Sequence, residues 1–358
     1  MNPITLYRTK SPKARVDETD LSFGTVFPDH MFMMEWNEEK GWHDPRVLPH
    51  APVMTDPTVM ALHYGQVVFE GMKAFRDSDS RVRLFRPKDH FQRLVRSCKM
   101  MCIPEIDPEL ALSALKALLR VDIEWIPYTR GTSMYIRPLV FASEPHLGVR
   151  VSKEYIFLIM ASPVPFYFAK GFQPIRIQVI DEHGRTAPGG VGQAKTLANY
   201  ASGLQATHKA QQHGYDQVLW LDSCQHRWIE ELGTMNIFFR IDDQLVTPSL
   251  DRGTILSGIT RNSVIQLARD MGIAVEQRDI AMEELKDAYG QGRLKEVFGT
   301  GTAAAIAPIG VLHWKDVDMV IHEETVGEYT NELYKQLTDI QYGDRKDAHQ
   351  WMIPLDAD

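Results

Sequence analysis

The stretch "ELGTMNIFFRIDDQLVTPSLDRGTILSGITR", Glu231–Arg261, joins a predicted strand to a predicted helix. The residues "NIFFRI" (236–241) are typical of a buried strand. A helix is predicted over about 259–271, because Gly272 just beyond it is typical of the left-handed stop at helix C-termini. The same alternation of strand and helix continues on both sides of this stretch, so the sequence favours an α/β or α+β fold.

Two glycine-containing turns in this half of the chain could bind an anion. The predicted helix opens at Gly258-Ile259-Thr260, where free N–H groups and the helix dipole favour a phosphate. The turn "FGTGTAAA" (298–305) offers further N–H groups and hydroxyls, but it lacks the spacing of a P-loop. An ordinary capped helix and a simple tight loop remain the alternatives for these two features.

A single lysine follows a glycine-rich loop in "APGGVGQAKTLANYASGL" (187–204). Most such lysines are solvated, but burial or a cationic neighbour would lower the pKa of Lys195 and let its amine attack a carbonyl. If the ligand is pyridoxal phosphate, the site also needs an anion cradle and a carboxylate facing the pyridine nitrogen. The acidic pair Glu230 and Glu231 could supply that carboxylate, although an acidic pair in a turn is more often solvated.

The bulk composition excludes several classes of protein. The 39 basic and 47 acidic side chains of the 358 residues give a net charge of −8, which provides no basic field for nucleic acid or an anionic membrane. Cys98 and Cys102 lack the spacing and companion ligands of a zinc site, so we expect no metal and reduced packing cysteines. No secretory signal is evident at the N-terminus, and we expect a soluble cytoplasmic protein.

The chain is long enough for two domains. Two helices are predicted in "RPKDHFQRLVRSCKMMCIP" (86–104) and "DPELALSALKALLRVDIEWIP" (107–127), and a buried strand in "TSMYIRPLVFA" (132–142). A third helix is predicted over about 197–212, ended by Gly214. Because 162–174 is rich in proline and glycine, we expect a small N-terminal domain over 1–165, a linker over 166–174 and a larger domain over 175–358.

The order of these features resembles a known family. Glu231-Leu-Gly-Thr-Met-Asn236-Ile-Phe, Leu245-Val-Thr247 and Leu256-Ser-Gly258-Ile259-Thr-Arg261 match the long signature of the class IV pyridoxal-phosphate aminotransferases. Further blocks resemble the branched-chain amino acid aminotransferases in their longer form, over roughly residues 20 to 345. These blocks are "DHMFMMEWN", "ALHYGQVVFEGMKAFR", "RLFRPKDHFQRL", "MYIRPLVFASEPHLGV" and "YDQVLWLD".

The resemblance implies the fold-type IV architecture, with a small N-terminal α/β domain and a larger C-terminal pseudo-barrel domain that binds pyridoxal 5′-phosphate. It implies that Lys195 carries the cofactor covalently and that Glu231 lies at the pyridine nitrogen. Further cofactor contacts are implied for the phosphate arginine Arg93, for the phosphate cup Ile259, Thr260 and Thr302, and for Tyr200 at the cofactor's O3′.

The resemblance also implies a substrate pocket and a homodimer. Pocket side chains are implied at Tyr64, Phe69, Tyr135 and Arg137, and α-carboxylate binding by the N–H groups of Ala303 and Ala304. Leu147 and Val149 match a loop that reaches the other subunit's site in this family. The segment "GTAAAIAP" (301–308) lacks the Cys-x-x-Cys of mammalian members, so we expect no thiol redox control there.

The implied reaction is the transfer of an amino group between leucine, isoleucine or valine and 2-oxoglutarate. Arg137 would then bind the γ-carboxylate of glutamate, because burying an unpaired charge is costly; a structural salt bridge is its alternative role. Three rival functions are a D-amino acid aminotransferase, an aminodeoxychorismate lyase and a non-catalytic scaffold. The first two tend to be shorter, and a scaffold would need neither Lys195 nor Glu231.

Overall fold

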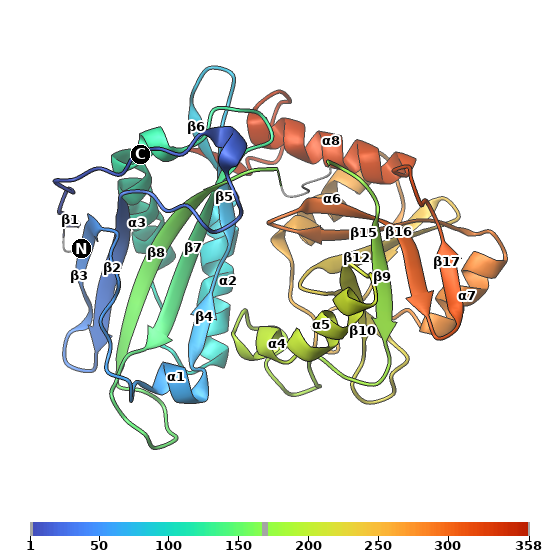
Figure 1. Ribbon diagram of the computed structural model, residues 1–358, viewed down its shortest axis with the longest axis horizontal. Helices are drawn as coiled ribbons and strands as arrows, with labels where there is room; N and C mark the ends of the chain where they lie inside the picture. Colours follow the sequence, from blue (N-terminus) through green and yellow to red (C-terminus); the bar gives the residue numbers. More distant parts are fainter. Residues whose placement is uncertain (1–2, 167–170, 357–358) are drawn as a thin grey trace. The chain divides into compact units, whose positions relative to one another are not determined.

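The structure is a computed structural model that describes residues 3–166 and 171–356 (Figure 1). The described residues form two compact units. Unit 1 holds residues 3–166, 194–197 and 340–356, and unit 2 holds residues 171–193 and 198–339. Each unit has its own hydrophobic core and its own sheet.

Unit 1 is built on a sheet in the order β1-β3-β2-β8-β7-β5-β6-β18, with β4 paired to β7. All its neighbouring strands are antiparallel except β1 and β3. The strands are β1 (Thr5–Leu6), β2 (His30–Asn37), β3 (Gly41–Pro49), β4 (Val67–Phe69), β5 (Met72–Arg76), β6 (Val82–Phe85), β7 (Ser133–Ala142), β8 (Glu154–Val164) and β18 (Met352–Pro354).

Helices α1 (Met60–Tyr64), α2 (Pro87–Met100) and α3 (Pro108–Val121) belong to this unit, together with the 3-10 turns Glu18–Asp20 and Ile123–Trp125. Helices α2 and α3 both begin with proline, whose missing N–H is harmless in the first turn. Their apolar faces are buried in the core of unit 1, as the spacing of Phe91, Leu94 and Cys98 predicts. The two helices and the strand predicted over 132–142 are confirmed.

Unit 2 contains a mixed sheet in the order β11-β10-β9-β16-β15-β12-β13-β14, with β17 paired to β16. Its strands are β9 (Ile175–Ile180), β10 (Gln217–Leu221), β11 (Ile229–Leu232), β12 (Asn236–Ile241), β13 (Gln244–Thr247), β14 (Val275–Gln277), β15 (Leu294–Gly301), β16 (Ala305–Trp314) and β17 (Val317–Val320). Its helices are α4 (Ala198–Ala201), α5 (Leu204–Gln212), α6 (Ile259–Asp270) and α7 (Met282–Gly290), and α8 (Glu328–Tyr342) starts in it.

Two predicted helices of unit 2 have different outcomes. Helix α6 and its left-handed stop at Gly272 (φ 74°) are confirmed. The single helix predicted over 197–212 is wrong, because the chain forms α4 and α5 with a break at Gly203. A Cβ on Gly203 would lie 3.0 Å from the indole of Trp220, so close packing against β10 favours glycine there.

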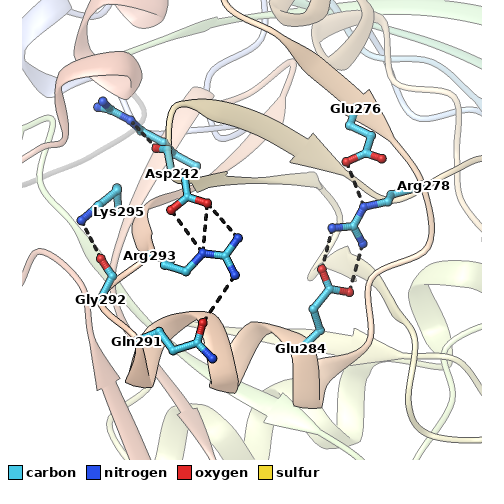
Figure 2. Close-up of polar contacts among 9 residues, drawn as sticks. Asp242, Glu276, Arg278, Glu284, Gln291, Gly292, Arg293 and Lys295 are labelled. Carbon is cyan, nitrogen blue, oxygen red and sulfur yellow. Dashed lines mark hydrogen bonds and ion pairs between the residues drawn. The ribbon is translucent and has the colours of Figure 1, made fainter.

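Arginine–carboxylate pairs link α7 to its flanking segments (Figure 2). Arg278 lies 2.5 Å from Glu284 of α7 and 3.0 Å from Glu276 of β14. Arg293, just after α7, lies 2.8 Å from Asp242 in the turn between β12 and β13. Because these ion pairs are exposed to solvent, they contribute little to stability and form a solvated surface network.

The domain scheme predicted from the sequence stays a prediction. Part of its linker, 166–174, falls on residues 167–170, which lie outside the described residues. The compact units are not continuous in sequence, since β18 pairs with β6 and thus returns the C-terminal segment to unit 1. Among the described residues, no helix is both long and apolar enough to cross a membrane.

The cysteines do not all have the predicted packing role. All three are free thiols, and Cys98 is buried in the core of unit 1. Cys102 and Cys224 are exposed, so the prediction of packing cysteines is wrong for these two. Cys102 follows the end of α2 at a positive φ of 53°, in a turn where its side chain faces outward.

Candidate active site

Lys195 is held in unit 1 by backbone hydrogen bonds on both sides of a short extended segment. Its N–H donates to the hydroxyl of Ser97 on α2 at 2.9 Å. Its carbonyl accepts from the N–H of Phe69 on β4 at 3.0 Å. The hydroxyl of Thr196 donates to the carbonyl of Val67 at 2.7 Å. The segment thus lies along β4, and the lysine side chain starts from a fixed backbone.

The side chain of Lys195 lies in a half-buried, partly cationic setting. Its Nζ is 4.8 Å from the ring centroid of Phe69. Burial and the guanidinium groups of Arg93 and Arg137 lower the pKa of the Lys195 amine to about 8, although Glu70 acts in the opposite direction. A lysine with this pKa is partly unprotonated near neutral pH, as nucleophilic and basic catalysis by an amine requires.

Arg93 lies on α2 and is buried against Glu70, which follows β4. Both carboxylate oxygens of Glu70 accept hydrogen bonds from Arg93, at 2.6 and 2.9 Å. Burial alone would raise the pKa of Glu70, but the Arg93 guanidinium and the hydrogen bonds hold it well below its usual value. The charge of the arginine is therefore balanced by a carboxylate that the sequence analysis did not single out.

Tyr135 and Arg137 form one polar wall near Lys195. They lie two residues apart on β7, and Arg137 Nη2 donates to the Tyr135 hydroxyl at 2.9 Å. The Arg137 guanidinium also lies over the ring of Phe69, 4.6 Å from its centroid. Among the described residues, Nε of Arg137 is buried without a hydrogen-bond partner. The wall therefore offers a cation that can pair with an anionic ligand, next to the aromatic surface of Phe69.

Phe23 is a wall residue that sequence reasoning missed. It lies in the irregular N-terminal segment, and its ring centroid is 5.0 Å from that of Tyr135. Gly71 packs against the same wall, and a larger residue would clash there, because an added Cβ would lie only 2.2 Å from the Tyr135 hydroxyl. No periodic pattern marks Phe23 in the sequence, so only the fold places it beside Tyr135.

Three other predicted residues form a separate exposed group. Tyr64 at the end of α1 is 42% exposed, and its hydroxyl donates to the carbonyl of Leu147. Leu147 and Val149 lie in the loop between β7 and β8, and their side chains are 59% and 81% exposed. Apolar side chains this exposed are available to a partner.

Glu231 lies on β11 of unit 2 and is buried among polar partners. Asn236 donates through its amide to a carboxylate oxygen of Glu231 at 3.1 Å and to the carbonyl of Leu256 at 3.0 Å. The other oxygen is bonded to the guanidinium of Arg185, which also donates to the carbonyl of Thr254 at 2.9 Å. The expectation that such an acidic residue is solvated is therefore wrong for Glu231, which is 4% exposed.

The first turn of α6 lies next to this group. Its N-cap is Gly258, which has no side chain to satisfy the N–H groups of the first turn. A Cβ on Gly258 would lie 1.9 Å from the amide oxygen of Asn236, so glycine is required by close approach. Ile259 and Thr260 are both buried in this turn.

Four further predicted cofactor and substrate positions lie elsewhere in unit 2. Thr302, Ala303 and Ala304 form the turn between β15 and β16. The sheet register places Asn236 of β12 opposite Thr300 of β15, so this turn follows the strand next to the Asn236 group. Tyr200 lies on the short helix α4 and is half-buried.

Comparison with known proteins gives the family. The family model described as amino-transferase class IV matches residues 67–311. The chain belongs to the class IV aminotransferases. The resemblance noted in the sequence and the predicted enzyme class are thereby confirmed.

Individual members of the family agree with this result. The branched-chain-amino-acid aminotransferase 2 of Bacillus subtilis is 48% identical over 354 residues, covering 99% of this chain and 97% of the relative. The crystal structure of the Escherichia coli branched-chain amino acid aminotransferase superposes with a TM-score of 0.76 at 27% identity, covering 92% of this chain and 99% of that chain. These matches confirm the predicted fold class.

A second solved structure bears on the cofactor. It is a T.th. branched-chain amino acid aminotransferase complexed with N-(5′-phosphopyridoxyl)-L-glutamate, and it superposes with a TM-score of 0.73 at 27% identity. The match covers 90% of this chain and 98% of that chain. That protein binds a conjugate of the phosphorylated cofactor with an acidic amino acid.

Proposed function

We propose that this class IV aminotransferase transfers the amino group between L-leucine, L-isoleucine or L-valine and 2-oxoglutarate, with pyridoxal 5′-phosphate carried on Lys195. The observation that supports this most is the setting of the lysine. Its amine has a pKa lowered to about 8 and lies among Phe69, Arg93 and Arg137. The names of the relatives point to branched-chain amino acids as substrates.

The residues present fit the cofactor. Pyridoxal phosphate supplies an aldehyde that takes up amines and a ring that accepts electrons. Unit 1 provides Lys195 for the aldehyde and Arg93 for the phosphate. Unit 2 provides the first turn of α6, where the N-terminal end of the helix dipole favours an anion such as phosphate. We propose the remaining cofactor contacts for Tyr200, Glu231, Ile259, Thr260 and Thr302.

Each side chain has a specific chemical task in this proposal. Lys195 would take up the proton of the substrate's Cα on its Nζ and hold it for return, because the pKa of its amine lies near working pH. Glu231 keeps a positive charge at the pyridine nitrogen, and Asn236 and Arg185 hold its carboxylate in one orientation. Arg93 binds the phosphate.

The wall of Tyr135 and Arg137 accounts for two unlike substrates. Phe69 and Phe23 offer apolar surface to a branched side chain, while Arg137 offers a cation to the γ-carboxylate of glutamate. One methylene in an apolar pocket changes binding by about 1–3 kcal/mol, so all three branched substrates should react. We propose that the N–H groups of Ala303 and Ala304 bind the α-carboxylate.

We propose a homodimer from the exposed apolar group of unit 1. Leu62, which is 70% exposed, and Val151, which is 52% exposed, extend the group formed by Tyr64, Leu147 and Val149. Sedimentation of the purified protein should give twice the mass of one chain. A Val149→Glu variant should dissociate more readily, and a wild-type monomer would contradict the dimer.

One assay tests the reaction against its rivals. Purified protein is incubated with L-leucine and 2-oxoglutarate, and L-glutamate is measured. Formation of glutamate supports the proposal. Activity only with D-alanine would indicate a D-amino acid aminotransferase, release of pyruvate from aminodeoxychorismate would indicate the lyase, and protein that is colourless and inert would indicate a scaffold.

A further inference from the structure

The carboxylate of Glu70 is completely buried, at 0% exposure. A buried carboxylate is costly unless its oxygens accept hydrogen bonds. Oε1 accepts from Nε of Arg93 at 2.6 Å, and Oε2 accepts from Nη2 of the same arginine at 2.9 Å. Oε2 also lies 2.8 Å from Nδ1 of His90 and 3.2 Å from the N–H of Gly71. Both oxygens are therefore satisfied, and the carboxylate has one orientation.

The backbone of Glu70 is fixed by the strands that hold the candidate active site. Its N–H donates to the carbonyl of Pro138 on β7, at 2.8 Å, directly after Arg137. The preceding residue, Phe69, donates its N–H to the carbonyl of Lys195 at 3.0 Å. The position of the carboxylate is thus set by the segments that carry the lysine and the polar wall.

Arg93 and His90 lie one turn apart on α2 and both point toward Glu70. An arginine side chain has many rotamers, and ordering it costs conformational entropy. The two parallel hydrogen bonds hold the plane of the Arg93 guanidinium. The carboxylate therefore pre-orders the arginine before a ligand binds.

The charges of this cluster also act on Lys195. Arg93 lowers the pKa of the Lys195 amine, and Glu70 raises it. The carboxylate thus limits the effect of the arginine on the lysine, while burial remains the main cause of the low pKa. A neutral side chain at position 70 would leave the positive charge of Arg93 uncompensated in a buried place.

We propose that Glu70 is a positioning residue that holds Arg93 in the orientation that binds the phosphate of the cofactor. This rests on the proposed function, because it takes Arg93 as the phosphate ligand. In this proposal Glu70 acts through Arg93, because its fully buried carboxylate is already held by Arg93, His90 and the N–H of Gly71. Its contribution is therefore specific to the phosphorylated form of the cofactor.

The test compares two ligands that differ only in the phosphate. The full chain is freed of cofactor, and binding of pyridoxal phosphate and of pyridoxal is titrated by absorbance. In Glu70→Gln, affinity for pyridoxal phosphate should fall about 10- to 100-fold. Affinity for pyridoxal should change by less than about threefold, because pyridoxal has no group for Arg93 to bind. Equal losses for both ligands, or no loss, would overturn the proposal.

A double-mutant cycle shows whether Glu70 acts through Arg93. In an Arg93→Gln background, the Glu70→Gln change should have no further effect on pyridoxal phosphate affinity. Additive losses would overturn the proposal. The matched control is Asp77→Asn, since Asp77 also pairs with two arginines of unit 1, Arg81 at 3.0 Å and Arg83 at 2.7 Å. Its affinities for both ligands should equal those of wild type.

A second variant keeps the proposal testable if Glu70→Gln does not fold. Glu70→Asp keeps the charge but draws it back by one methylene. It should lower the affinity ratio of pyridoxal phosphate to pyridoxal at least about threefold, and an unchanged ratio would overturn the proposal. A wild-type protein that binds neither ligand would refute the proposed function, whereas normal wild-type binding with an unaltered Glu70 variant would refute the positioning role alone.

Discussion

Replacing Arg137 by methionine separates the two half-reactions that we propose. Methionine keeps most of the apolar volume that lies over Phe69 but removes the charge and the hydrogen bond to Tyr135. Glutamate presents a second carboxylate, and leucine presents none. The variant should therefore harm the glutamate half-reaction far more than the leucine half-reaction.

The structure sets the size of the difference. A carboxylate held by two N–H groups of Arg137 would make two charge-assisted hydrogen bonds, each about 1.5–3 kcal/mol. Their loss lowers kcat/KM for glutamate at least about 100-fold, since about 1.4 kcal/mol is a factor of ten. For leucine the variant removes only the cation–π contact between Arg137 and Phe69. That contact is worth about 0.5–1 kcal/mol, so kcat/KM for leucine should fall less than about sixfold.

The assay measures each half-reaction by single-turnover absorbance changes of the bound cofactor. Arg15→Met is the matched control, because Arg15 is exposed and pairs only loosely with Glu124, at 3.3 Å. It should leave both half-reactions unchanged. Equal losses for glutamate and leucine in Arg137→Met would refute the reasoning and assign Arg137 a structural role.

Three further predictions concern Glu231, Lys195 and Gly258. Glu231→Gln should retain the cofactor but slow the leucine half-reaction at least about 100-fold, and an unchanged rate would remove Glu231 from the mechanism. Burial lowers the pKa of both Lys195 and Lys73 to about 8, whereas an unfolded lysine titrates near 10.5. The unfolded chain therefore binds more protons at these two lysines, so the free energy of unfolding of cofactor-free protein should rise with pH from about 8 to 9; above pH 9 the Cys98 thiol, whose pKa burial raises to about 12, opposes the rise. Denaturant titrations of Lys195→Met should lose about half of that rise, and an unaltered rise would show that the amine is solvated. Gly258→Ala places a Cβ 1.9 Å from Asn236 and should lower stability by about 1–3 kcal/mol. Gly290→Ala, where a Cβ meets open space, should be neutral or slightly stabilising, and equal melting temperatures for the two variants would contradict the steric argument.

Local patterns were sufficient to predict several elements. Helices α2 and α6 have an apolar stripe or a glycine stop within their own sequence, and both form as predicted. The break at Gly203 does not follow from the stripe alone: glycine is a poor helix former, and its close approach to the indole of Trp220 on β10 is set by the fold.

In the candidate site, likewise, some residues could be predicted from the sequence and others could not. Lys195 and Glu231 could be singled out because their chemistry and their motifs coincide. Glu70 could have been suspected as an acid within the apolar run "VVFEGMKAF" (67–75), but its pairing with Arg93 depends on the packing of α2 against β4. Phe23 and Arg185 reach Tyr135 and Glu231 only through the fold.

The central claim is that the amine of Lys195 carries the cofactor. Purified yellow protein is reduced with borohydride, digested, and mapped by mass spectrometry. The account predicts the phosphopyridoxyl group on Lys195, in the peptide that contains "GQAKTLANY" (192–200), and no attachment in a Lys195→Ala variant. The group on another lysine, such as the half-buried Lys73, with Lys195 unmodified, would contradict it.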